Sequence, residues 1–173
     1  YWDLLGTIRT PWLLGVVTLA LYGAAAWVVC EALGITSRAG VVLGSGLMVT
    51  CPAMISSNFY LTSAHIYAGA LLFACMAAYA YEKWRHGWIA AFVFMLLSEG
   101  SYAAYIGMTL SLFFLCSLKE LLFDQEANDK HNLVRHFGML FLFGSSMVAT
   151  TVICNLITAN NTAGRVQDAQ AQA

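Results

Sequence analysis

Long apolar runs alternate with short polar segments along most of this chain. Four of the runs approach the length of about 20 residues that lets a helix cross a bilayer. The other two are shorter and flank the sequence LLSEGSYAAYIG, residues 96–107, which carries a glutamate, two glycines and two tyrosines. The six runs cover Trp12–Leu33, Ala39–Ile55, Ala64–Tyr81, Trp88–Leu97, Tyr102–Leu118 and Phe137–Thr158.

The stretch around residues 96–107 is either the middle of one long helix or a break between two short ones. The distribution of positive charge distinguishes the two cases, because cytoplasmic loops of membrane proteins are enriched in Lys and Arg. One continuous helix would divide the eight Lys and Arg residues evenly between the two sides. A break near Glu99 and Gly100 leaves only Arg9 and Arg165 outside, and places six on the inner side: Arg38, Lys83, Arg85, Lys119, Lys130 and Arg135.

These patterns predict an all-α fold, a polytopic transmembrane helix bundle. We expect about six spans, with a short broken pair around residues 98–101. Residues 1–158 would form the transmembrane domain, and the polar residues 159–173 a disordered tail. Because residue 1 is Tyr rather than Met, we expect the chain to be part of a longer protein.

Composition supports the membrane assignment and narrows the chemistry. The chain is 60% hydrophobic and only 10% charged, whereas soluble domains carry about 25% charged residues. The net charge of −1 gives no indication of nucleic-acid binding. The five cysteines lie in apolar runs without the spacing of metal ligands. The sequence therefore predicts the lipid bilayer as a partner and no metal site.

The predicted break supplies the first candidate site. A broken helix at membrane depth must face protein or water, because lipid cannot satisfy its free backbone groups. Glu99 would then lie in a recess open to the outside, and an ionisable residue at this depth indicates a functional site. Tyr102 and Tyr105 are three residues apart and would share a helix face lining that recess. The alternative is that Glu99 is an interfacial residue and the tyrosines are membrane anchors.

A second candidate group lies on the outer side, in segments before the third span. Asn58 belongs to the polar stretch SSNFYLTSAH, and His65 enters the following helix. His65 could bind a phosphate or a sugar, although a histidine at a helix entry is commonly structural. Arg9, before the first span, is the one early outer cation that could pair with a phosphate; it could also be a plain interfacial charge.

The sequence LLSEGSYAAYIGMTLSLFFLCSLKELL resembles a segment of the Gtr-type O-antigen glucosyltransferases, polytopic enzymes of the GT-C class. Their pattern reads approximately S-x-G-x-Y-Q-A-Y-I between two apolar runs. Ala103 replaces the usual Gln, so a hydrogen bond from that side chain is absent here. The matching residues are Ser98, Gly100, Tyr102, Ala104, Tyr105 and Ile106.

The resemblance implies transfer of glucose, or a related sugar, from a polyprenyl-phosphate carrier to a lipid-linked or surface glycan such as lipopolysaccharide O-antigen. It also implies a bacterial inner-membrane location, multiple spans and a periplasmic site. Acidic catalytic residues of this class lie in an early outer loop, which we expect upstream of Tyr1. The chain itself would contribute substrate-binding walls through Ser98, Glu99, Tyr102, Tyr105, Asn58, His65 and Arg9. Glu99 could bind sugar hydroxyls or a metal, so a divalent cation stays open as a cofactor.

Two other classes of function compete with the transferase. Broken helices also form the substrate sites of secondary transporters and flippases, although this chain shows no repeat of the broken pattern. A membrane scaffold without any site is the third interpretation. It would be favoured if Glu99 faced lipid or were packed without a cavity.

Overall fold

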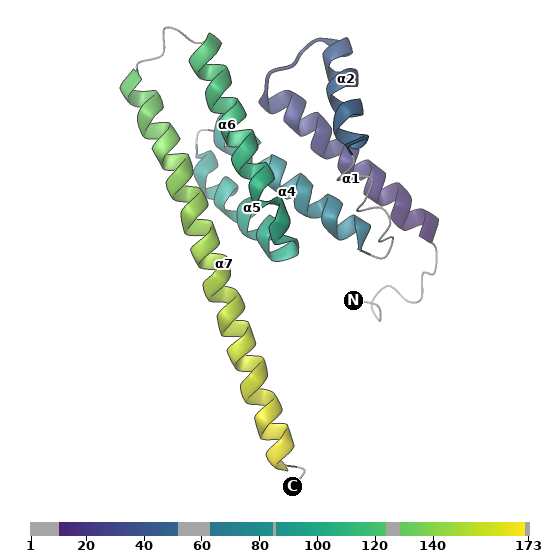
Figure 1. Cartoon of the computed structure of the whole chain (residues 1–173), viewed down its shortest axis with the longest axis vertical. Helices are drawn as coiled ribbons and strands as arrows, with labels where there is room; N and C mark the ends of the chain where they lie inside the picture. The colour runs from purple at the N-terminus through teal and green to yellow at the C-terminus, as the bar shows by residue number, and fades with distance from the viewer. Residues whose placement is uncertain (1–10, 52–62, 85, 124–128, 172–173) are drawn as a thin grey trace.

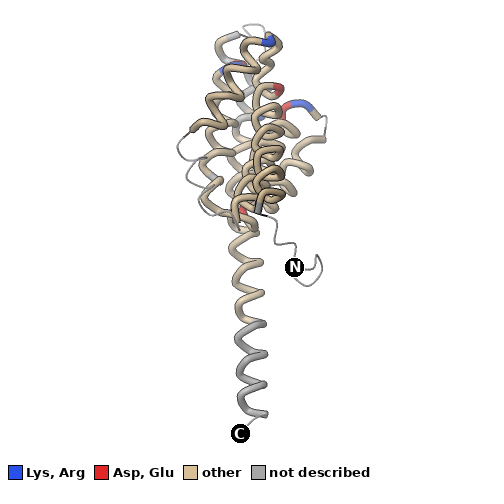
Figure 2. The backbone as a smooth tube through the Cα atoms, turned by 90° about the vertical axis from the view of Figure 1, so that its right-hand side faces the viewer, with Lys and Arg blue, Asp and Glu red and all other residues tan. Residues whose placement is uncertain are grey.

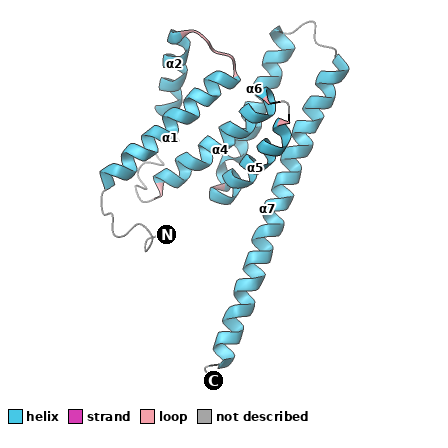
Figure 3. Cartoon of the chain, turned by 180° about the vertical axis from the view of Figure 1, so that it is seen from behind, coloured by secondary structure: helices cyan, strands magenta, loops and turns pink. Residues whose placement is uncertain are grey.

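A computed structural model describes residues 11–51, 63–84, 86–123 and 129–171, and within these ranges the ordered elements are all helices (Figure 3). A 3-10 turn, Ala103–Tyr105, joins α5 to α6. Four stretches are long and apolar enough to cross a membrane, and α2 and α5 are shorter apolar helices. The predicted all-α bundle is therefore confirmed. Its helices are α1 (Pro11–Ala32), α2 (Arg38–Val49), α4 (Ala64–Lys83), α5 (Gly87–Ser101), α6 (Ile106–Phe123) and α7 (Asp129–Ala171).

Helix α4 lies at the centre, with α1 on one side and α5 on the other (Figure 1). Its buried surface is made almost entirely of small side chains, which lets neighbouring helices approach closely in the absence of water. Gly87, the first residue of α5, makes the closest approach: a Cβ there would collide with the carbonyl oxygen of Ala80. The buried residues of α4 are Ala64, Ala68, Ala70, Leu71, Ala74, Cys75, Ala77, Ala78 and Ala80.

The predicted break between the two short runs is present, and it begins at Tyr102. Residues 98–101 are still helical and form the last turn of α5, which the Tyr102 N–H closes by donating to the Ser98 carbonyl at 2.8 Å. Tyr102 then takes an extended conformation, with φ −161° and ψ 101°. The helical hydrogen bonding thus continues through the polar residues and ends one residue after the predicted range.

Basic residues of the described part gather at one end of the bundle, away from the C terminus (Figure 2). Arg135 pairs with Glu82, the neighbour of Lys83. An added Cβ on Gly34, just before Arg38 and the start of α2, would lie 3.0 Å from the Lys119 Nζ. We call this the charged end; it is formed by Arg38, Lys83, Lys119 and Arg135, all predicted for the inner side.

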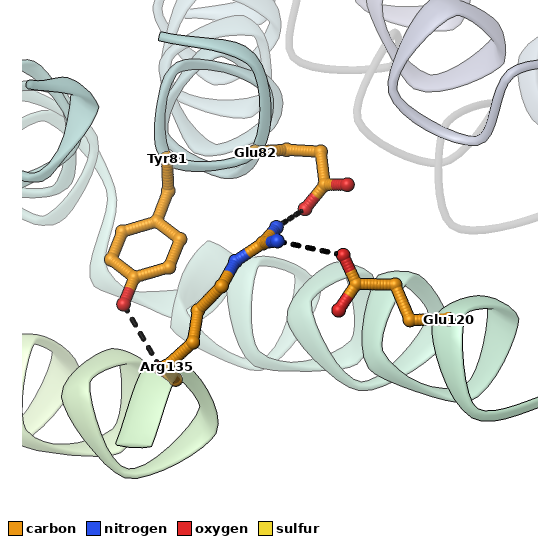
Figure 4. A network of polar contacts seen from close by, with 4 residues as sticks. All are labelled: Tyr81, Glu82, Glu120 and Arg135. Carbon is orange, nitrogen blue, oxygen red and sulfur yellow. Dashed lines mark hydrogen bonds and ion pairs between the residues drawn. The ribbon is translucent and has the colours of Figure 1, made fainter. Parts of the chain in front are cut away.

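An ion-pair network fastens three helices at the charged end (Figure 4). The Arg135 guanidinium, from α7, bonds the carboxylate of Glu82 on α4 and that of Glu120 on α6, the latter at 2.8 Å. The Tyr81 hydroxyl donates to the Arg135 carbonyl at 2.9 Å. The side chains of Glu82 and Glu120 are only 11% and 12% exposed, so both carboxylates that bond Arg135 are largely shielded from water.

Helix α7 packs mainly against α5 and extends well beyond the bundle toward the C terminus (Figure 1). Its backbone is helical to Ala171, where the sequence predicted a disordered tail from residue 159. Alanine and glutamine, which are frequent in the last residues of this helix, are good helix formers. Its apolar part, Phe137–Ala159, is 23 residues long, or about 34 Å.

We expect Arg135→Gln to lower the stability of the protein by about 1–3 kcal/mol, because it leaves two largely buried carboxylates without their cation. Thermal unfolding in detergent, followed by size-exclusion chromatography, measures the effect. Lys83→Gln is the control, since the described residues give Lys83 no ion pair. Equal melting temperatures for the two variants would contradict the structural role of the network.

Candidate functional site

The last turn of α5 is held from two sides by polar side chains. The Ser98 hydroxyl donates to the Ala70 carbonyl of α4 at 2.8 Å. The Glu99 carboxylate turns to α7, where Ser146 donates to Oε1 at 2.8 Å and Thr150 donates to Oε2 at 2.6 Å. Ser98 and Glu99 are both buried, at 2% and 7% exposure. These three hydrogen bonds therefore fix the end of α5 just before the break.

The Glu99 carboxylate lies deep within the apolar thickness of the bundle. Its partners Ser146 and Thr150 lie about 14 Å and about 20 Å beyond Phe137 along α7, close to the middle of the apolar part of that helix. On α4, the partner of Ser98 is about 9 Å from the first residue of the helix. A break at this depth must be covered by protein or water rather than lipid.

Tyrosine rings from three helical segments meet at the break. The ring of Tyr102 lies 4.5 Å from that of Tyr67 on α4 and 5.6 Å from that of Tyr105 in the 3-10 turn, measured between centroids. The hydroxyl of Tyr22, from α1, lies close to that of Tyr105. Tyr22 is buried, whereas 41% of Tyr102 is exposed. In this tyrosine cluster, the Tyr102 ring is therefore partly exposed and is supported by the rings packed against it.

The structure divides the predicted site into two parts. Tyr102 and Tyr105 are in contact, as predicted, but through the extended residue and the 3-10 turn rather than through one helix face. The side chains of Glu99 and Ser98 bond other helices, and the Ser98 backbone is linked to the cluster, since the Tyr102 N–H donates to the Ser98 carbonyl at 2.8 Å. His65 lies in the first turn of α4, with a buried Nδ1 that has no hydrogen-bond partner among the described residues.

Arg9 and Asn58 lie outside the described residues, so their predicted roles stay predictions. Among the residues that the structure does describe, no group of three or more His, Cys, Asp or Glu side chains could hold a metal ion. The cysteines of this part are free thiols. The chemistry available at the break is therefore that of phenol rings, hydroxyls and one carboxylate.

Sequence reasoning missed four members of the site: Tyr22, Tyr67, Ser146 and Thr150. A signal for the last two was present, because hydroxyl residues at i and i+4 share a helix face and here interrupt an otherwise apolar run. Ser146 and Thr150 lie more than 45 residues from Glu99 along the chain. Periodicity identifies such a pair as a polar patch but does not name its partner.

The fold and the site define an all-helical membrane protein with a broken helix pair and an interhelical polar site. A family model described as glucosyl transferase GtrII matches residues 2–172. The chain belongs to this family of glucosyltransferases, which confirms the resemblance drawn from the motif at the break. No curated protein and no solved structure gives a significant match.

Replacing Ser98 tests the anchoring of the break to α4. We expect Ser98→Ala to lower the stability by about 0.6–1.5 kcal/mol, since it leaves the buried Ala70 carbonyl without its cross-helix donor. Ser101→Ala is the matched control: Ser101 is exposed on the same turn and bonds only its own helix. Thermal unfolding of both variants in detergent gives the comparison. A control as unstable as Ser98→Ala would argue against the anchor.

Proposed function

We propose that this chain forms the substrate-binding part of a GT-C-class glucosyltransferase of the bacterial inner membrane. The enzyme moves glucose, or a related sugar, from a polyprenyl-phosphate carrier to a lipid-linked or surface glycan on the periplasmic side. The family supplies the reaction class. The observation that carries the location of the site is the tyrosine cluster at the helix break, within a membrane bundle.

The tyrosine cluster has the chemistry that a sugar requires. A pyranose ring offers C–H faces, which pack on aromatic rings, and hydroxyls, which exchange hydrogen bonds with phenol groups. Tyr102 is the exposed member, and its ring is supported by Tyr67 and Tyr105. A rigid aromatic surface of this kind loses little conformational entropy when a ligand binds.

The orientation follows from the charged end. The positive-inside rule assigns Arg38, Lys83, Lys119 and Arg135 to the cytoplasm, which directs the opposite end, with the break, toward the periplasm. A polyprenyl donor keeps its tail in lipid and its phosphate near the interface. Its sugar then reaches the break from the side or from outside, together with an acceptor that arrives from the periplasm.

The general base of the reaction is assigned to another part of the enzyme rather than to Glu99. Transfer to an acceptor hydroxyl needs a carboxylate that can reach and deprotonate it, and donors or a cation that stabilise the leaving phosphate. Both oxygens of Glu99 already accept hydrogen bonds from α7, and the residue is 7% exposed. Its surroundings favour a supporting role, with Arg9 and His65 as candidates for the phosphate.

Replacing Tyr102 in the full-length enzyme tests the aromatic surface. We expect Tyr102→Ala to reduce kcat/KM for a polyprenyl-phosphate glucose donor about 3–10-fold, the loss of one aromatic contact. Tyr102→Phe keeps the ring and should retain most of the activity. Transfer of radiolabelled glucose in membrane vesicles provides the measurement. Phe114→Ala, which removes an exposed ring of α6, is the control and should behave as the wild type.

Accessibility of the break tests the orientation. Tyr102→Cys is made in a protein whose exposed Cys51 and Cys154 are replaced by Ser, and is treated from the periplasmic side with a membrane-impermeant maleimide. We expect labelling at position 102, slowed by the polyprenyl-phosphate glucose donor, and none for Lys83→Cys at the charged end. Labelling of position 83 but not 102 would reverse the proposed topology.

A further inference from the structure

Two side chains of helix α7 hold the Glu99 carboxylate by hydrogen bonds. Ser146 and Thr150 are one helical turn apart, so their hydroxyls project from the same face. Each donates to a different carboxylate oxygen, at 2.8 Å and 2.6 Å. The two distances are those of hydrogen bonds to an oxygen acceptor, the second being short enough for a charge-assisted bond. We call Glu99, Ser146 and Thr150 the carboxylate clamp.

The hydroxyls next to the clamp residues on α7 bond their own helix instead. Buried or lipid-facing Ser and Thr residues satisfy themselves by donating to a carbonyl of the preceding turn. Thr151, next to Thr150, does this with the Met147 carbonyl at 2.8 Å, and Ser145, next to Ser146, does it with the Leu142 carbonyl at 2.8 Å. Thr150 instead sends its hydroxyl across to α5, and Ser146 divides its one proton between Glu99 Oε1 and the Phe143 carbonyl of its own helix, at 2.8 Å and 2.9 Å. The clamp is therefore a cross-helix contact and not a general property of polar residues in α7.

A short covalent path connects the clamp to the exposed tyrosine. Glu99 is three residues before Tyr102, and Tyr102 caps α5 through its N–H bond to the Ser98 carbonyl. Ser98 is tied to α4 by its own hydroxyl. The last turn of α5 is thus held between α4 and α7, and the direction in which the chain leaves the helix at Tyr102 depends on both attachments.

We propose that Ser146 and Thr150 are positioning residues of the sugar-binding surface, which act by clamping Glu99 so that Tyr102 stays seated between Tyr67 and Tyr105. This inference rests on the proposed function and extends the site to α7, where the sequence placed no site residue. The clamp touches no reacting atom. Its loss should therefore weaken substrate binding and leave the chemical step unchanged.

The experiment uses the full-length enzyme and a polyprenyl-phosphate glucose donor. Thr150→Val removes the hydroxyl at nearly constant shape, and we expect KM for the donor to rise about 3–10-fold while kcat changes less than about twofold. Thr150→Ser restores a hydroxyl and should restore KM. Thr151→Val is the matched control, with the same substitution one residue away. Ser146→Ala, with Ser145→Ala as its control, repeats the test at the other hydroxyl of the carboxylate clamp.

A double-mutant cycle shows whether the effect passes through Glu99. In a Glu99→Met background the clamp is already absent, so Thr150→Val should have no further effect on KM. If Thr150→Val raised KM in the Glu99→Met background as much as in the wild type, the proposal would be overturned. Equal KM changes for Thr150→Val and Thr151→Val would overturn it as well. A fall in kcat at constant KM would overturn it too, because it would assign Thr150 to the chemical step.

Maleimide labelling separates failure of the clamp from failure of the proposed function. If the wild-type enzyme does not use the donor, the proposed function fails, but the labelling rate of Tyr102→Cys still reports the position of the break. We expect Thr150→Val to change that rate at least about threefold and Thr151→Val to leave it unchanged. Equal rates in the two backgrounds would show that α7 does not set the position of residue 102.

Discussion

Hydrocarbon offers no hydrogen bonds, and this constraint explains where most polar side chains of the described bundle lie. The charged side chains Glu82, Glu120 and Arg135 are paired at one end. Hydroxyls such as that of Thr151 turn back onto their own helix. Glu99 is the exception, a carboxylate at the depth where water is absent on the lipid side, and it is stabilised by two hydroxyls from another helix. The position of α5 against α7 follows from that requirement.

Close packing and the helix break together produce the tyrosine cluster. The alanine surface of α4 brings α1 and α5 near to it, so that tyrosines from α1, α4 and the 3-10 turn come within contact distance. The extended conformation of Tyr102 then leaves that ring partly exposed, while Tyr22 is buried.

Apolar runs and charge placement predicted the helices, the break and the end at which the basic residues gather, because these features depend on local sequence and on the bilayer. The end of α5 was less predictable, since Ser98, Gly100 and Ser101 are weak helix formers. Contacts of Ser98 with α4 and of Glu99 with α7 hold this turn in the helix. The partners of Glu99 were not predictable at all. Pairing across two helices is a tertiary property, and many hydroxyl residues of the chain would have fitted the same pattern.

Because α7 is long, the carboxylate clamp also bears on how this helix can rotate. The helix is continuous over 43 residues, or about 64 Å, and α5 engages it near the middle of its apolar part. Turning a helix about its axis by one residue position rotates its side chains by about 100°. Such a step would carry both hydroxyls away from Glu99 at once. The clamp therefore restrains the rotation of α7 together with the Arg135 contacts at the charged end, and a twist applied to this helix would be resisted beside Tyr102.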